Sequence, residues 1–223
     1  MNVIVIAPHP DDETLGCGGT ILKHKEAGDS VYCVFVTSMW EEYGFSEDQI
    51  KIQEQQINNV SRVYNFDDIF QLKYPTTRLD IIPMAEIIFE ISGVFKQVMP
   101  EVVYLPNRSD VHSDHRVVFY AAFACTKAFR CPSIKKILMY ETISETNLMP
   151  AFADNMFIPN YYINITKYFE RKVTILETCY DKEIGLPPFP RSIQNVETLA
   201  KFRAMGGGGM QYAEAFCLIK RIV

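Results

Sequence analysis

Short runs of apolar, often β-branched residues recur along the whole chain, and each has the length of one buried strand. Longer stretches with apolar residues at helical spacing separate these runs. Strands that alternate with helices favour a mostly parallel sheet covered on both faces, because each parallel connection must cross over the sheet. We therefore expect an α/β fold, a Rossmann-like three-layer sandwich. The expected strands are residues 3–7, 31–37, 101–105, 136–140, 161–165 and 216–222, and the expected helices are residues 15–27, 47–63, 80–98, 114–129, 167–180 and 193–204.

Length and composition indicate a single globular domain over residues 1–223, because 48% hydrophobic and 22% charged residues are ordinary values for a packed core. The formal net charge of −5 argues against nucleic acid as a partner, which would require a basic surface. We expect no signal peptide and no integral membrane segment. Six cysteines without a CxxC pair indicate reduced thiols and a cytoplasmic protein. A homo-oligomer remains open.

Two loops that follow expected strands carry most of the ionisable side chains that could do chemistry. In open α/β sheets ligands bind beyond the carboxyl ends of the strands, which selects residues 8–19 and 106–116. The first loop contains His9, Asp11, Asp12 and Glu13, and the second adds two histidines and two aspartates. Three of the four histidines of the chain fall in these two loops, whereas His24 lies in mid-helix and is expected to be ordinary surface.

Crowded carboxylates are costly unless a cation neutralises them, and imidazole with carboxylate is a ligand set that suits zinc. Three protein ligands plus water are typical of a catalytic zinc. His9, Asp12 and His115 would supply such a site. Another divalent metal ion in place of Zn²⁺ remains open. The alternative is purely structural, with Asp11, Asp12 or Asp114 capping the helix that follows its loop.

The segment His9-Pro10-Asp11-Asp12-Glu13, together with His112-Ser113-Asp114-His115, resembles the paired motif of the LmbE-like, or PIG-L, zinc-dependent de-N-acetylases. That family includes enzymes that deacetylate N-acetylglucosaminyl-phosphatidylinositol and glucosamine intermediates of bacillithiol and mycothiol. The resemblance extends to most of the chain and implies that His9, Asp12 and His115 bind zinc. It also implies that Asp11 is the general base and that His112 polarises the amide oxygen or its oxyanion.

Elementary chemistry supports these roles. Zinc lowers the pKa of its bound water to about 7, so that a neighbouring carboxylate such as Asp11 can take the remaining proton. A fixed donor such as His112 would stabilise the oxyanion by about 3–4 kcal/mol. We expect Asp114 or Asp110 to hydrogen-bond His112 and orient it. Arg108, Trp40 and Tyr212 are the candidates for substrate contacts.

The chain departs from the family near residue 51, where an Arg-x-x-Glu pattern is common. It offers Lys51-x-x-Glu54 or Gln53-x-x-Gln56 instead, so the arginine is missing. The glycines 206–209 form either a lid or a plain loop. The leading hypothesis is removal of the N-acetyl group from a small-molecule amino sugar, free, nucleotide-linked or lipid-linked. The alternatives are metal-dependent hydrolysis of another amide or ester, and a non-catalytic sugar-binding protein.

Overall fold

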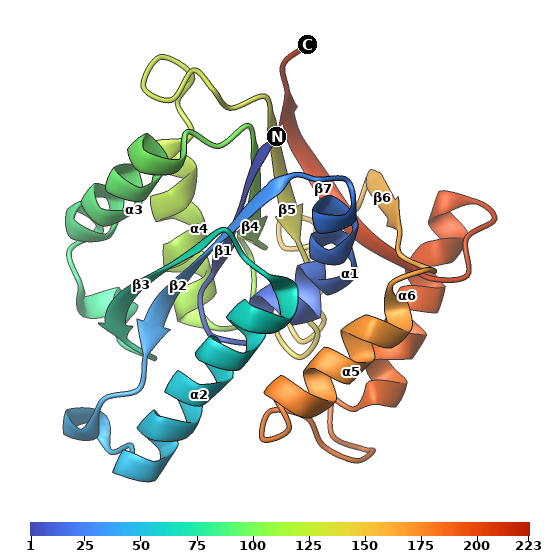
Figure 1. Ribbon diagram of the computed structural model, residues 1–223, viewed down its shortest axis with the longest axis horizontal. Helices are drawn as coiled ribbons and strands as arrows, with labels where there is room; N and C mark the ends of the chain where they lie inside the picture. The colour runs from blue at the N-terminus through green and yellow to red at the C-terminus, as the bar shows by residue number, and fades with distance from the viewer.

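The computed structural model describes residues 1–223 and consists of a seven-stranded sheet between two layers of helices (Figure 1). This arrangement confirms the predicted α/β class, and none of the helices is both long and apolar enough to cross a membrane. The strands are β1 (Asn2–Ala7), β2 (Ser30–Ser38), β3 (Asp68–Pro75), β4 (Val102–Pro106), β5 (Lys136–Tyr140), β6 (Tyr161–Asn164) and β7 (Ala213–Arg221). The helices are α1 (Asp12–Glu26), α2 (Glu47–Tyr64), α3 (Met84–Val98), α4 (Ser113–Cys125), α5 (Phe169–Cys179) and α6 (Ile193–Gly207), with short 3₁₀ turns η1 (Glu41–Tyr43) and η2 (Leu79–Ile81).

The strand order is β3-β2-β1-β4-β5-β7-β6, so that later strands lie on both sides of β1. All neighbouring strands from β3 to β5 are parallel, and only β7 runs antiparallel to both of its neighbours. The chain proceeds from β1 outward to β2 and β3, and then returns to build β4 and β5 on the other side of β1. The order therefore reverses between β1 and β4, where open α/β sheets bind their ligands.

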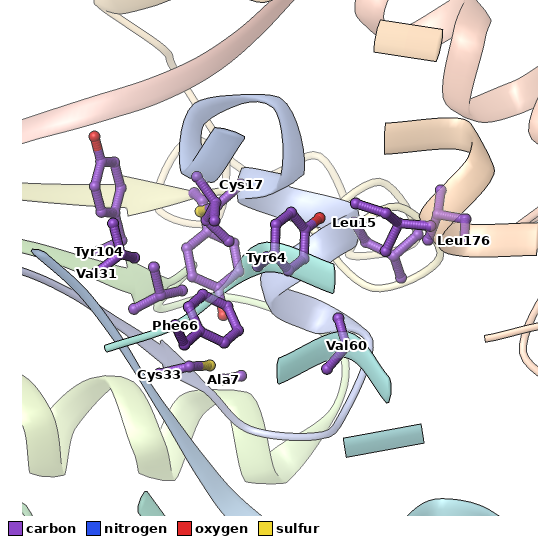
Figure 2. Close-up of a cluster of buried hydrophobic side chains, with 14 of the residues drawn as sticks. Ala7, Leu15, Cys17, Val31, Cys33, Val60, Tyr64, Phe66, Tyr104 and Leu176 are labelled. Atoms are coloured by element: carbon purple, nitrogen blue, oxygen red, sulfur yellow. The ribbon is translucent and has the colours of Figure 1, made fainter. Parts of the chain in front are cut away.

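Two separate cores explain why the central strands are apolar throughout. Helices α1, α2, α5 and α6 cover one face of the sheet, and α3 and α4 cover the other (Figure 1). Alternate residues of β1 point to opposite faces, so that Val3 and Val5 join the first core while Ile4 and Ile6 join the second. Figure 2 shows part of the first core, where Val31 and Tyr104 of the sheet lie among side chains of α1, α2 and α5.

The structure differs from the sequence expectation at several elements. Strand β3 was not predicted, because it is an edge strand whose partly exposed, mixed residues lack a continuous apolar run. The helix expected over residues 80–98 begins only at Met84, since Pro83 separates it from the turn η2. The glycines 206–209 are not entirely a loop. Gly206 and Gly207 form the last turn of α6, and Gly206 packs against Tyr162.

His24 is not the surface residue that we expected. Its side chain is only 16% exposed and links two parts of the fold. Nδ1 donates to Asp29 (2.7 Å), and Nε2 accepts from the buried hydroxyl of Tyr104 on β4 (2.9 Å). Burial lowers the pKa of His24, and the neutral ring provides one donor and one acceptor for these two partners.

Helix α1 is anchored in mid-course by a buried ion pair. Lys172 of α5 lies 2.7 Å from Glu214 of β7, and both side chains are almost fully buried. Lys172 also donates to the carbonyl of Leu15, while Glu214 accepts from the backbone N–H groups of Gly19 and Thr20. Side chains from two distant segments thus satisfy backbone groups inside α1. This anchoring fixes the helix whose first turn carries Asp12.

Close packing of α1 against the sheet predicts a stability effect at Gly16. A Cβ there would lie 2.3 Å from Cδ2 of the buried Tyr140, so Gly16→Ala should destabilise the fold by about 1–3 kcal/mol. Gly93 of α3 is the matched control, because a Cβ there meets nothing within 4 Å. Gly93→Ala should stabilise the protein by about 0.5–1 kcal/mol. Denaturant unfolding measures both, and equal effects at the two glycines would contradict the packing argument.

Candidate metal-binding active site

The two loops selected from the sequence meet at the reversal point between β1 and β4. His9 lies two residues after the end of β1, Asp12 opens α1, and His115 lies in the first turn of α4. One potential ligand atom from each of the three lies within 4.8 Å of the others. Oδ2 of Asp12 is 3.3 Å from Nδ1 of His9 and 3.2 Å from Nε2 of His115. The three residues predicted as metal ligands therefore form one cluster.

Two further carboxylates orient the imidazoles of this cluster. Nδ1 of His115 donates to Oδ2 of the buried Asp110 (2.8 Å), and Nε2 of His9 donates to Oδ2 of the buried Asp114 (3.1 Å). This pairing corrects the expectation that Asp110 or Asp114 holds His112. Asp114 reaches the His112 ring only at 4.0 Å, because its oxygens also accept the backbone N–H groups of Thr77 and Leu79.

The donor set fits a divalent metal ion. Nε2 of His115 is buried and has no hydrogen-bond partner, even though it lies 3.2 Å from Asp12. Buried polar atoms are rarely left without a partner, so this unpaired nitrogen indicates that a ligand binds there. Imidazole nitrogens that are held from behind by carboxylates are typical of zinc sites. His9, His112 and Asp114 form a second possible set, but the oxygens of Asp114 already accept three hydrogen bonds.

The buried charges in the cluster shift one another strongly. Burial lowers the pKa of His9, but hydrogen bonds to Asp114 and Asp12 outweigh this effect and raise the pKa to about 9. Burial also lowers the pKa of His115, but the charge of Asp12 and the hydrogen bond to Asp110 outweigh burial and raise the pKa to about 10. The pKa of Asp12 is held well below its usual range, because both imidazoles outweigh the effect of burial.

Asp11 occupies an unusual backbone conformation beside the cluster. Its φ of 125° is a value that L-residues with side chains rarely adopt. The carboxylate of Glu13, fully buried, accepts the N–H of Asp11 (3.1 Å) and the hydroxyl of Tyr180 (2.8 Å). Burial raises the pKa of Glu13 to about 7, against the effect of these donors. Glu13 therefore supports the backbone of Asp11.

Arg191 pairs with the side chain of Asp11 and was not identified from the sequence. Its Nη1 lies 2.7 Å from Oδ2 of Asp11, and its Nε donates to Ser144 (2.8 Å). Burial raises the pKa of Asp11 well above its usual value, although the guanidinium opposes the rise. Arg191 ends the proline-containing segment 186–191, and nothing in the sequence around it indicates the pairing with Asp11.

His112 is poised as a neutral donor. Its Nδ1 accepts the backbone N–H of Asp114 at the start of α4, which places the ring proton on Nε2. Burial and the positive charge of His9 lower the pKa of His112 to about 4, so the ring is neutral near pH 7. The rings of His9 and His112 meet edge to face with centroids 4.5 Å apart.

A cleft of about 190 Å³ opens over this cluster. Its walls come from residues that follow β1 to β5, from α2 and from the segment before α6. Gln53 and Gln56 of α2 line it, whereas Lys51 is exposed and pairs with Glu47. The helix therefore presents Gln53-x-x-Gln56 to the cleft, and the only arginine that lines it is Arg191.

The residues predicted to contact substrate lie in different places. Trp40 lines a groove that adjoins the cleft. The guanidinium of Arg108 donates to the carbonyl of Asp154 (2.8 Å), and Arg108 does not line the cleft. Tyr212 stacks on Phe169 and donates to Glu197, also outside the cleft. Both side chains are already committed to structural partners.

This site and this fold define the class of protein. The family model described as PIG-L, GlcNAc-PI de-N-acetylase, matches residues 4–126, which is more than half of the chain. The chain therefore belongs to the PIG-L family of de-N-acetylases, as the sequence motifs had indicated.

Individual proteins are similar at lower identity. A diacetylchitobiose deacetylase from Thermococcus kodakarensis is 24% identical over 185 residues, which cover 79% of this chain and 68% of the relative. The N,N'-diacetylchitobiose deacetylase structure from Pyrococcus horikoshii has a TM-score of 0.74 at 22% identity, covering 98% and 83% of the two chains. The 4-carboxy-2-hydroxymuconate hydratase GalB from Pseudomonas putida has a TM-score of 0.72 at 17% identity, covering 100% and 98%. The fold is thus shared with enzymes of different chemistry.

The contacts of Glu13 predict a stability effect beside the cluster. Glu13→Ala removes the acceptor of the Asp11 N–H and the Tyr180 hydroxyl, and each unsatisfied buried group costs about 1–3 kcal/mol. Glu13→Gln keeps an acceptor oxygen and should cost less. The exposed Glu177→Ala is the control. Chemical denaturation measures all three, and an unfolding free energy of Glu13→Ala equal to that of Glu177→Ala would disprove the supporting role.

Proposed function

We propose that this protein is a zinc-dependent hydrolase that removes the acetyl group from the nitrogen of an N-acetylated amino sugar. The observation that carries the proposal is the buried Nε2 of His115. This nitrogen has no hydrogen-bond partner, and it lies in the cluster that His115 forms with His9 and Asp12. Membership of the de-N-acetylase family and the two diacetylchitobiose deacetylases among its relatives support the choice of reaction.

The proposed ligands are His9, Asp12 and His115. A zinc ion bound there would lower the pKa of a water molecule and polarise the amide carbonyl of the substrate. Asp110 and Asp114 fix the ring orientations of the two imidazoles through the hydrogen bonds described above. Of the residues predicted to be catalytic, Asp114 therefore acts as a positioning residue in this proposal.

Asp11 is the proposed general base. It takes a proton from water as the water oxygen attacks the acetyl carbon, and it returns that proton to the sugar nitrogen as the carbon–nitrogen bond breaks. The products are acetate and a primary amine. Glu13 and Arg191 hold the backbone and the carboxylate of Asp11 in place, so that the base has one defined position.

His112 is the proposed donor to the amide oxygen. Negative charge develops on that oxygen during attack, and the Nε2–H of a neutral imidazole can donate to it. The backbone N–H of Asp114 keeps the proton on Nε2 by occupying Nδ1. The ring therefore needs no reorganisation as the charge develops.

Three alternatives are separated by experiment. The fold is shared with GalB, a 4-carboxy-2-hydroxymuconate hydratase, and the cluster of His9, Asp12 and His115 is equally compatible with hydrolysis of another amide or ester. A non-catalytic sugar-binding protein would have no use for a supported carboxylate beside the metal ligands. A screen that detects both acetate and a new primary amine from N-acetylated sugars distinguishes the proposed reaction from all of these.

The role of Asp11 predicts a separation of metal binding from turnover. Asp11→Asn should retain about one zinc per chain and lose about 10²- to 10⁴-fold in kcat, because the amide cannot accept the proton. Metal analysis and acetate release measure the two properties. The exposed Asp48→Asn is the matched control and should behave as the unaltered protein. Full activity of Asp11→Asn would remove Asp11 from the mechanism.

The pairing of Asp110 with His115 predicts a change in metal affinity. Asp110→Asn weakens the acceptor behind the imidazole and should reduce zinc affinity about 10- to 100-fold. Competition with a chelator of known affinity measures the dissociation constant, again with Asp48→Asn as control. An unchanged zinc affinity would show that the ion is bound elsewhere.

A further inference from the structure

A groove of about 410 Å³ adjoins the metal cleft along the amino-terminal half of α2. The groove and the cleft share Met39 and Gln53 in their walls, so they adjoin each other. The cleft alone, at about 190 Å³, is smaller than common small-molecule sites, which span about 300–1,000 Å³, whereas the groove lies within that range. A ligand that fills ordinary binding volume would therefore extend from the cleft into the groove.

Trp40, the only tryptophan of the chain, forms a fixed aromatic surface in this groove. Its side chain is large and apolar, yet the residue is 40% exposed. The indole N–H donates to the hydroxyl of Ser38 (3.0 Å) and the carbonyl of Lys73 (3.1 Å), which satisfies its only donor and restrains the ring. An exposed ring that is held in one orientation is available for stacking against a flat apolar ligand face.

Unused amide groups lie where the groove and the cleft meet. The Nε2 of Gln56 is fully buried in the wall of the cleft and has no partner. Gln53, one turn away and only 7% exposed, accepts the N–H of Met39 through Oε1, which leaves its own NH₂ group as a donor. Amides are suited to hydroxyl groups, because each amide can donate and accept. Gln53 lines both the cleft and the groove, and its NH₂ group would donate to a polyhydroxylated ligand there.

The charge of the groove favours a cationic occupant. Glu41, Glu42 and Glu54 line it, and Lys73 is the only cation among its walls. The face of an indole ring also attracts cations. A sugar unit that carries a protonated amino group combines a stackable ring, hydroxyl groups and positive charge.

We propose that this groove is a second sugar subsite, which takes a saccharide unit with a protonated amino group while an adjoining N-acetylated unit occupies the metal cleft. This inference rests on the proposed function. It makes the substrate an amino-sugar oligosaccharide that is already partly deacetylated.

Intrinsic fluorescence of Trp40 tests the subsite without any turnover. The probe is the fully deacetylated disaccharide of glucosamine, which has no acetyl group to lose, and cellobiose is its neutral counterpart with hydroxyls in place of amines. The glucosamine disaccharide should change the emission saturably and bind about fivefold to tenfold more tightly than cellobiose. No saturable change, or equal affinity for the two disaccharides, would overturn the proposal.

A pair of variants on one helix locates the charge effect. Glu54→Gln removes a carboxylate from the groove and should weaken binding of the glucosamine disaccharide severalfold, leaving cellobiose unaffected. Glu47→Gln, on α2 but outside the groove, should leave both affinities unchanged. Equal effects of the two variants would remove the groove from the proposal. Acetate release is measured separately, so that failure of the deacetylase reaction leaves the binding result interpretable.

Discussion

The crowding of buried charges between β1 and β4 is the constraint around which the rest of this structure is arranged. Asp11, Asp12, Asp110 and Asp114 are all buried there together with His115. Buried charges are tolerated only when they are paired and hydrogen-bonded, and removal of one partner leaves an uncompensated charge. Each carboxylate accordingly has a defined partner, and segments far apart in sequence supply those partners. The site is therefore also a point where the loops of the sheet are fastened to one another.

Those partners come from several segments that reach this edge of the sheet. Asp114 accepts backbone N–H groups from the segment after β3, and Asp110 accepts the hydroxyl of Thr146 from the segment after β5. Arg191 brings the loop before α6 onto Asp11. Loops positioned in this way behave as part of a rigid scaffold, which a site that depends on donor geometry requires. Lys172 and Glu214, which anchor α1 in the middle of the helix, likewise help to fix the position of Asp12 in its first turn.

The sequence predicted the central fold and the residues of the candidate metal cluster because both leave local signals. Apolar runs located β1, β2, β4 and β5, and the clustering of His9, His112 and His115 located the site. Edge strand β3 escaped because burial, which creates the signal, is incomplete there. Arg191 escaped because it lies 180 residues from Asp11 in sequence, and nothing local marks the pairing. The true partners of Asp110 and Asp114 depend on ring orientations within one small cluster, which spacing alone cannot distinguish.

The position of Arg191, the only arginine that lines the cleft, also bears on which sugar conjugates the cleft can accept. Helix α2 contributes the neutral Gln53 and Gln56, so the guanidinium of Arg191 is the only arginine charge in the cleft. That guanidinium is already paired with Asp11 and lies 3.5 Å from Glu145 and 3.7 Å from Glu183. A phosphate next to the acetamido sugar would meet these carboxylates without an uncommitted cation to bind it, and like charges disfavour such a ligand. Under the proposed function, the charge distribution therefore favours uncharged or cationic sugars over nucleotide-linked and phospholipid-linked ones.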